Sequence, residues 1–461
     1  MNYVSTRGNA PAVDFVSASL AGLAPDGGLY SPETFPEIAR PGVSATYPDI
    51  AVRILKAFAG DSLDEEIIRG LVDRAYAPFA HKSVAPLTQV GPGRWMLELH
   101  HGPTLAFKDV AMRLIAQLYD HILGERGERM TILCATSGDT GGAAAAAFAG
   151  SSNVDLVILH PLDRVSPTQR LFMTATGASN VHNLALEGDF DGTQAILKRL
   201  LADEQFRRRT HLAAVNSINW TRVAAQSVYF AQAQAQLGAE TRIRFVVPTG
   251  NFGDALAGYV AARSGLLTGF ECVAAVNAND ALARLLEGNA LTRGATQPTL
   301  SPAMDIQLPS NFERLLFEAA GRDGAIVARA YDQLAATGKS DLPKEAIRSL
   351  GEMGLSAERV SDAETLEEMR RTHAETGWIV CPHTAVGLAA ARRGEFPEGA
   401  IVTLATAHAA KFPETVEKAL GVRLDLPERA ADFATRQEVF AVGPMSEAFV
   451  RDRIDSIVRG R

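Results

Sequence analysis

Cysteine is scarce in this sequence, with three residues in 461 positions. Cys134, Cys272 and Cys381 lie far apart, and each lies in or beside an apolar run. The chain therefore lacks the closely spaced cysteines of a disulfide-stabilised secreted domain. We expect three reduced, buried thiols and a reducing compartment, which favours a cytoplasmic protein.

Long apolar runs are also missing. A membrane span needs roughly 18 or more mostly apolar residues, and the best uncharged candidate, Val223–Ala239, is interrupted by glutamines. The first residues, Met1–Arg7, do not form an apolar signal segment. We expect no membrane association.

An excess of positive charge is absent as well. Charged residues make up 21% of the chain, they carry both signs, and the formal net charge is −8. A nucleic-acid-binding protein needs a clustered basic face. We therefore expect no nucleic-acid partner, and the composition is typical of an enzyme with about two or three domains.

The chain does contain a regular alternation of β-rich runs and helical patterns from Arg129 onward, which is the signature of an α/β fold. The expected strands are Met130–Cys134, Val154–Leu159, Val181–Leu186 and Leu212–Val215 in a first series, then Ile243–Val247, Cys272–Val276, Trp378–Cys381 and Ala400–Leu404 in a second. We predict two α/β domains with mostly parallel sheets flanked by helices.

The domain boundaries follow from changes in this pattern. Residues 1–90 form an N-terminal segment, and residues 279–375 are more polar and helical, which indicates a helical insertion. We assign 91–119, 221–278 and 376–461 to a large domain. Residues 120–220 form a smaller domain, which we expect to move and close on substrate.

One lysine lies at the junction between an apolar run and a helical pattern. Met96–Leu99 ends a strand, Gly102 and Pro103 break it, and apolar residues at helical spacing begin at Asp109. Lys108 has apolar neighbours, and burial lowers an amine's pKa and suits a Schiff-base nucleophile. On this stretch alone a solvated surface lysine is the commoner outcome.

Two polar, glycine-containing junctions follow strands and open helices, at Thr136–Gly141 and Pro248–Asp254. Backbone N–H groups and the helix dipole at such a junction hold an anion. The second junction suits a cofactor phosphate, and the first, with more hydroxyls, suits a substrate carboxylate. An ordinary strand–helix turn remains the alternative for both. Neither has the G-x-G-x-x-G spacing of a dinucleotide site.

The other polar candidates are a threonine and three histidines. Thr406 and His408 follow the last expected strand and could reach a cleft, although a helix-capping role is equally possible for the threonine. His100 and His101 are adjacent, so their side chains should diverge in a strand, and no third ligand is evident. We expect no metal site.

Together these stretches resemble threonine synthase, a pyridoxal-phosphate enzyme of the tryptophan-synthase-β fold type (fold type II). The resemblance rests on Gly102–Asp109, Thr136–Gly141 and Pro248–Asp254, with further matches at Tyr3–Gly8, Asp26–Tyr30, Asn216–Trp220, Ala303–Ile306, Pro309–Arg314 and Thr406–Phe412. The motifs run in the expected order from residue 3 to residue 412. The insertion is similar to that of the longer bacterial and fungal branch.

The resemblance implies a role for each cofactor-binding residue. Lys108 would bind pyridoxal phosphate covalently through an imine and later move protons. Thr406 would face the pyridine nitrogen. The phosphate loop would consist of Gly250, Asn251, Phe252, Gly253 and Asp254.

It also implies a substrate site, in which Ser137, Thr140 and nearby amides would hold the substrate carboxylate, with Thr136 beside them. Many relatives of this fold type have Asn where this chain has Asp139, and an ionised Asp139 could not donate that Asn's bond to the cofactor ring oxygen. The candidates for binding the substrate phosphate are Arg164 with Ser166 in the same loop, and Lys411.

The implied reaction converts O-phospho-L-homoserine and water to L-threonine and phosphate, by γ-elimination and β-addition of water, as the last step of threonine biosynthesis. The alternatives left open are a serine/threonine dehydratase, a β-replacement synthase or a phospholyase of the same fold type, and a silent pyridoxal-phosphate-binding homologue. A monomer or homodimer is expected.

Overall fold

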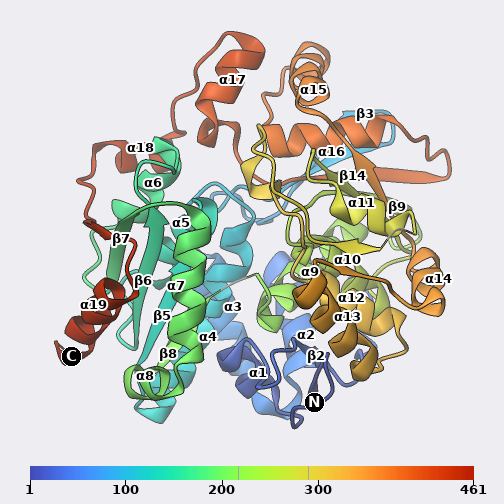
Figure 1. Cartoon of the computed structure of the whole chain (residues 1–461). Helices are drawn as coiled ribbons and strands as arrows, with labels where there is room; N and C mark the ends of the chain where they lie inside the picture. Colours follow the sequence, from blue (N-terminus) through green and yellow to red (C-terminus); the bar gives the residue numbers. More distant parts are fainter. Residues whose placement is uncertain (216, 289, 461) are drawn as a thin grey trace. The chain divides into compact units, whose positions relative to one another are not determined.

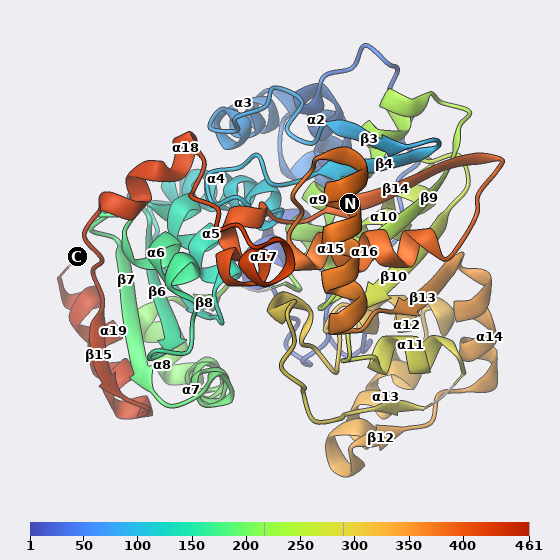
Figure 2. The same ribbon diagram turned by 90° about the horizontal axis from the view of Figure 1, so that it is seen from above.

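The chain folds into two compact units in a computed structural model that describes residues 1–215, 217–288 and 290–460. Unit 1 comprises residues 1–72, 81–101 and 217–424, and unit 2 comprises residues 73–80, 102–216 and 425–461. Each unit contains its own sheet (Figures 1 and 2). The predicted α/β class with two mostly parallel sheets is confirmed.

The sheet of unit 1 has six strands in the order β13-β10-β9-β14-β4-β3. All neighbours are parallel except β3 and β4, which form an antiparallel hairpin. The strands are β3 (Leu87–Gly91), β4 (Arg94–Glu98), β9 (Arg242–Pro248), β10 (Glu271–Val276), β13 (Leu355–Arg359) and β14 (Gly399–Ala405).

Helices cover both faces of this sheet because its strands are apolar on both sides. On one face Val246 and Ile401 pack against Val386 of α16, and on the other Phe245 meets Phe230 of α9 with ring centroids 4.8 Å apart. The helices of unit 1 are α1 (Phe15–Ala21), α2 (Tyr47–Ala59), η1 (Gly60–Ser62), α9 (Trp220–Leu237), α10 (Gly253–Arg263), α11 (Ala281–Leu286), η2 (Pro302–Met304), α12 (Phe312–Ala319), α13 (Gly324–Thr337), α14 (Lys344–Glu352), α15 (Asp362–Thr376), α16 (Pro382–Arg392), η3 (Ala409–Lys411) and α17 (Pro413–Leu420).

The N-terminal segment belongs to unit 1 and is fixed by contacts with distant residues. Tyr3 packs against the ring of Trp220, and the carboxylate of Glu313 accepts hydrogen bonds from the Thr6 hydroxyl and from the Arg7 guanidinium. Two small antiparallel pairs complete the unit, β1 (Tyr3–Ser5) with β2 (Tyr30–Pro32) and β11 (Leu291–Thr292) with β12 (Lys339–Ser340).

Unit 2 contains a fully parallel five-stranded sheet in the order β15-β7-β6-β5-β8. The strands are β5 (Met130–Ala135), β6 (Val154–Pro161), β7 (Val181–Glu187), β8 (Leu212–Ala214) and β15 (Ala441–Pro444). Its helices are α4 (Lys108–Arg126), α5 (Asp139–Phe148), α6 (Pro167–Thr174), α7 (Phe190–Ala202), α8 (Glu204–Thr210), α18 (Glu428–Ala431), η4 (Asp432–Thr435) and α19 (Glu447–Arg459), while α3 (Glu65–Tyr76) begins in unit 1 and ends in unit 2.

The C-terminal residues complete the sheet of unit 2. Strand β15 pairs with β7, and the fully buried Val450 and Ile454 of α19 join the apolar cluster around Leu186 and Leu200. In Figures 1 and 2 this C-terminal segment, coloured red, lies beside the green β7. The expected large domain had included residues 102–119 and 425–461, which the structure groups with unit 2.

One predicted strand is wrong. Trp378–Cys381 forms no strand, because Gly377 ends α15 in the left-handed conformation and Cys381 already caps α16, its sulfur accepting the N–H of Thr384. The run is apolar because it joins two helices through a buried cluster that contains Val380. The segment 279–375, expected to be helical, also supplies strand β13 to the main sheet.

The three cysteines are buried thiols, as expected. Within the described residues, no helix combines the length and the apolar character that crossing a bilayer would take.

Candidate active site

Lys108 is the first residue of α4, in unit 2, and the loop before it is tightly constrained. The buried carboxylate of Asp109 accepts the N–H of Thr104 at 2.8 Å and its hydroxyl at 2.6 Å. A side chain at Gly102 would lie 2.4 Å from that carboxylate, so the loop requires glycine there. Leu105, at φ +61°, is fully buried. The Lys108 side chain is 11% exposed, so the loop holds this amine in a largely buried position.

Asp139 lies close to this amine. One carboxylate oxygen is 3.5 Å from the Lys108 Nζ, and the other accepts a hydrogen bond from the side-chain amide of Gln169 at 3.0 Å. The carbonyl oxygen of that amide accepts in turn from the hydroxyl of Ser166 at 3.1 Å. Asp139 therefore acts as an acceptor and a countercharge toward Lys108.

The predicted carboxylate-binding loop, Thr136–Gly141, joins β5 to α5. The hydroxyl oxygen of Thr136 accepts the N–H groups of Gly138 and Gly141, at 3.0 and 3.1 Å, so it holds the loop in shape. Ser137 is exposed and Thr140 half-buried, and neither hydroxyl has a hydrogen-bond partner within the described part of the chain. These two hydroxyls remain open to a ligand.

Arg164 and Ser166 lie in the loop between β6 and α6. Ser166 caps α6, since its hydroxyl oxygen accepts the N–H of Gln169. Arg164 is exposed and forms no ion pair with any described residue. Lys411, the other candidate cation, belongs to unit 1 and is 1% exposed. Of the two cations, Arg164 is the accessible one.

The predicted phosphate loop follows β9 in unit 1 and opens α10. No described residue accepts a hydrogen bond from the backbone N–H groups of Gly250, Asn251 or Phe252. The carboxylate of Asp254 accepts instead from the hydroxyl of Thr249 and the N–H of Ala255, and burial raises its pKa. Open N–H groups before a helix start fit a phosphate.

The loop is braced by η2 and by the segment after it. A side chain at Gly250 would lie 2.5 Å from the carbonyl oxygen of Ala303. Asn311 donates its side-chain amide to the carbonyl of Asn251 and to that of Ser217, and the Ser310 hydroxyl bonds the Asn251 side chain. The motifs at 217–220 and 303–314 therefore shape the phosphate loop, while Asn216 lies outside the described residues.

Thr406 lies at the same edge of the sheet as this loop. It directly follows β14, which is the parallel neighbour of β9, so both polar segments leave the carboxyl ends of adjacent strands. Thr406 is 5% exposed, and no described residue hydrogen-bonds its hydroxyl. Unit 1 thus places the predicted phosphate loop at the same sheet edge as an open hydroxyl.

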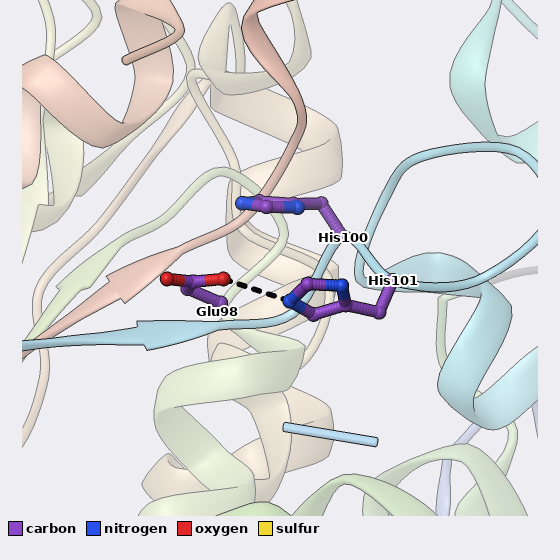
Figure 3. Close-up of side chains that lie close together, drawn as sticks. All are labelled: Glu98, His100 and His101. Atoms are coloured by element: carbon purple, nitrogen blue, oxygen red, sulfur yellow. Dashed lines mark hydrogen bonds and ion pairs between the residues drawn. The ribbon is translucent and has the colours of Figure 1, made fainter. Parts of the chain in front are cut away.

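A third strand end at this edge carries an interaction that the sequence did not predict. Glu98, at the end of β4, hydrogen-bonds the Nε2 of His101 at 2.7 Å (Figure 3). The expected divergence of His100 and His101 is wrong, because both follow the strand and their ring centroids are 5.0 Å apart. His408 packs edge-on against His100. The adjacent positions of His100 and His101 in the sequence do not by themselves predict this cluster.

Comparison with known proteins covers the whole chain. Residues 87–339 match the family described as pyridoxal-phosphate dependent enzyme, residues 2–76 match the threonine synthase N terminus, and residues 384–454 match the threonine synthase C-terminal family. The threonine synthase of Pseudomonas aeruginosa is 45% identical over 98% of this chain and 97% of its own length.

Two solved structures are similar throughout. A pyridoxal-phosphate-bound threonine synthase from Brucella melitensis has a TM-score of 0.96 and 43% identity, with 100% of both chains covered. The threonine synthase from yeast has a TM-score of 0.93 and 33% identity, covering 100% of this chain and 99% of its own.

Proposed function

Because this chain belongs to the threonine synthase family of pyridoxal-phosphate enzymes, we propose that it converts O-phospho-L-homoserine and water to L-threonine and phosphate. It is a lyase of threonine biosynthesis, and its cofactor is pyridoxal phosphate. The observation that carries the reaction is the likeness to threonine synthases along the full length, in sequence and in structure.

Three separate stretches of the chain would hold the cofactor. The open N–H groups of Gly250, Asn251, Phe252 and Gly253 suit its phosphate, and Lys108 suits the covalent bond to its aldehyde carbon. The carboxylate of Asp254 supports the loop by accepting from the Thr249 hydroxyl and the Ala255 N–H. The Thr406 hydroxyl would hydrogen-bond the ring nitrogen. When bound, pyridoxal phosphate supplies an electron sink that acidifies the hydrogen beside the amino group of an amino acid.

Lys108 would then handle the protons of the reaction. A free Lys108 amine can take the proton from the substrate's α-carbon, and the resulting ammonium would lie beside the Asp139 carboxylate at 3.5 Å. The Gln169 amide keeps that carboxylate oriented. Asp139 thus favours the protonated amine between proton uptake and proton return.

The substrate's two charged ends need separate partners. Ser137, Thr140 and the amides of the loop shaped by Thr136 suit the carboxylate. Arg164 suits the phosphate, because its guanidinium is accessible and has no carboxylate partner among the described residues. Ser166 lies two positions away and holds Gln169, so it would support this loop.

The central test replaces Lys108. Wild-type protein should show a visible cofactor absorbance and release phosphate and L-threonine in equal amounts from O-phospho-L-homoserine. Lys108→Ala should lose both the covalent absorbance and the products, whereas Lys198→Ala, which changes an exposed lysine of α7, should retain them. A Lys108→Ala protein that keeps the covalent absorbance would refute the assignment. Ammonia and keto acid in place of threonine would instead indicate a dehydratase.

A second test concerns the phosphate end of the substrate. Arg164→Gln should raise the KM about tenfold or more, because a charge-assisted hydrogen bond to an anion is lost. Arg207→Gln, at another exposed arginine of unit 2, is the matched control and should leave the KM unchanged. An unchanged KM in Arg164→Gln would exclude Arg164 from the site.

We further propose a cytoplasmic location and a monomer or homodimer. The three buried thiols support a reducing compartment. Sedimentation of the purified protein would distinguish one chain from two.

A further inference from the structure

The strongest unassigned cluster lies at the end of β4. Glu98, His100 and His101 each place one potential metal-ligand atom so that all three lie within 4.8 Å of one another (Figure 3). The carboxylate is buried and both imidazoles are half-buried. Residues 98, 100 and 101 lie where the strand ends at Glu98 and an irregular stretch leads to the start of unit 2 at Gly102.

The carboxylate is held in place by its surroundings. Glu98 ends a strand that pairs with β14 and β3, and the next residue, Leu99, still donates its N–H to Ala405. The second carboxylate oxygen of Glu98 accepts a hydrogen bond from the hydroxyl of Thr88. Partners of this kind orient a metal ligand and are part of what makes a site bind tightly.

Two more imidazoles border the cluster but are less suited to complete it. The ring centroid of His81 lies 5.3 Å from that of His101, and the ring centroid of His408 lies 5.4 Å from that of His100. The Nδ1 atoms of both outer histidines accept backbone N–H groups, of Ser83 and Ala410 respectively. A fourth coordination position would therefore fall to water.

We propose that Glu98, His100 and His101 form a binding site for a zinc ion. Two imidazoles and one carboxylate, with a fourth position left for water, are a ligand set that Zn²⁺ takes in proteins, whereas Mg²⁺ and Ca²⁺ prefer oxygen ligands alone. The ion replaces the hydrogen bond between Glu98 and His101 by two metal–ligand bonds. It fixes the last residues of unit 1 before the chain enters unit 2.

The experiment is equilibrium dialysis of the holoenzyme against Zn²⁺, with the bound metal measured by elemental analysis. One equivalent per chain is expected. The variants His100→Ala and His101→Ala should each lose at least about tenfold in affinity. His121→Ala, which removes a half-buried histidine of α4 in unit 2, should bind as the wild type does.

Two features keep the result interpretable. Zinc that is bound by the cofactor phosphate would remain bound in His100→Ala and His101→Ala. The visible cofactor absorbance of each variant reports whether the variant is folded and contains the cofactor. Titration of Co²⁺ into wild-type holoenzyme should give the intense visible bands of a four-coordinate ion. This measurement requires no variant. Binding below one equivalent without these bands, or unchanged binding in both variants, would overturn the proposal.

Discussion

At the scale of single residues, Asp139 has the chemistry of an acceptor. The sequence raised the difficulty that an ionised aspartate is unable to donate the hydrogen bond that an asparagine gives in relatives. In the structure this carboxylate has other contacts, because it accepts a hydrogen bond from Gln169 and lies 3.5 Å from the Lys108 Nζ. Both contacts favour a negative charge at this position.

Replacing this charge should change the titration of the holoenzyme. A nearby opposite charge favours the protonated form of a nitrogen, so Asp139→Asn should lower the pH midpoint of the visible cofactor absorbance by about one pH unit. The variant retains an acceptor for Gln169, so the cofactor should stay bound. A spectrophotometric pH titration measures the shift. Asp191→Asn, at an exposed position of α7, is the control, and equal midpoints for all three proteins would contradict the assignment.

Local sequence predicted some of these residues and not others. Lys108 and the two polar strand–helix loops stand out in the sequence because a strand end, a glycine break and a helix start are signals within a dozen residues. Gln169 lies 30 positions from Asp139, and no local pattern links an amide in one helix to an acid in another. The pairing of Glu98 with His101 depends on where β4 ends.

At the scale of elements, the phosphate loop depends on the close approach of a neighbouring segment. A Cβ at Gly250 would lie 2.5 Å from a backbone oxygen, which has no flexible side chain to move aside. Gly250→Ala should therefore displace the loop and weaken cofactor binding about tenfold or more, measured by cofactor titration of the apoenzyme. The control is Gly351→Ala in α14, where no atom lies within 4 Å and where alanine should be neutral or stabilising. Equal cofactor affinities in both variants would contradict this role.

Glycine also permits a close contact between two helices of unit 2. Helix α5 begins at Asp139 and includes Gly141 and Gly142. A Cβ at Gly141 would lie 2.5 Å from the sulfur of Met173, and one at Gly142 would lie 3.0 Å from Phe172 of α6. These glycines permit α6 to pack closely on α5. Helix propensity alone does not predict glycine at these positions, because the reason is this tertiary contact.

The segment leading to β15 is held by a charged contact with a testable pH dependence. Arg170 donates two hydrogen bonds to Glu438, which lower the pKa of that carboxyl below its unfolded value of 4.5. The stabilisation is therefore fully present above that value and is lost as the pH falls through the lower folded pKa.

Glu438→Gln should accordingly lower the free energy of unfolding by about 1 kcal/mol at pH 7, a modest value because both side chains are about a quarter exposed. Thermal unfolding at several pH values measures the difference, which should vanish in acid. Glu204→Gln, at a more exposed ion pair in α8, should change the free energy of unfolding little. A difference that persists below the folded pKa would contradict the assignment.

At the scale of the whole molecule, the chain passes between the units five times, before Asp73, His81, Gly102, Ser217 and Asp425. Composition and periodicity predicted two α/β domains. They placed the C-terminal residues in the large domain and not with the strands of unit 2. The reason is that β15 is a four-residue strand with little pattern of its own, and pairing with β7 creates it.

Removing residues 425–461 should therefore destabilise unit 2 selectively. Val450 and Ile454 are fully buried, and each such side chain contributes about 1.5–3 kcal/mol. Limited proteolysis with mass spectrometry should show rapid cleavage within 102–215, while 217–424 persists. A chain lacking its last two residues is the control, and equal protection of unit 2 in both proteins would contradict this role for the C-terminal segment.

The contacts of Thr6 and Arg7 with Glu313 have a consequence for biosynthesis. Thr6 and Arg7 leave the ribosome long before their buried acidic partner, which is made 307 residues after Thr6. At about 5–20 residues per second, roughly 15–60 s of translation separate the two. During that interval the nascent chain carries an unfinished N-terminal surface, and chaperones would have this time window in which to engage it.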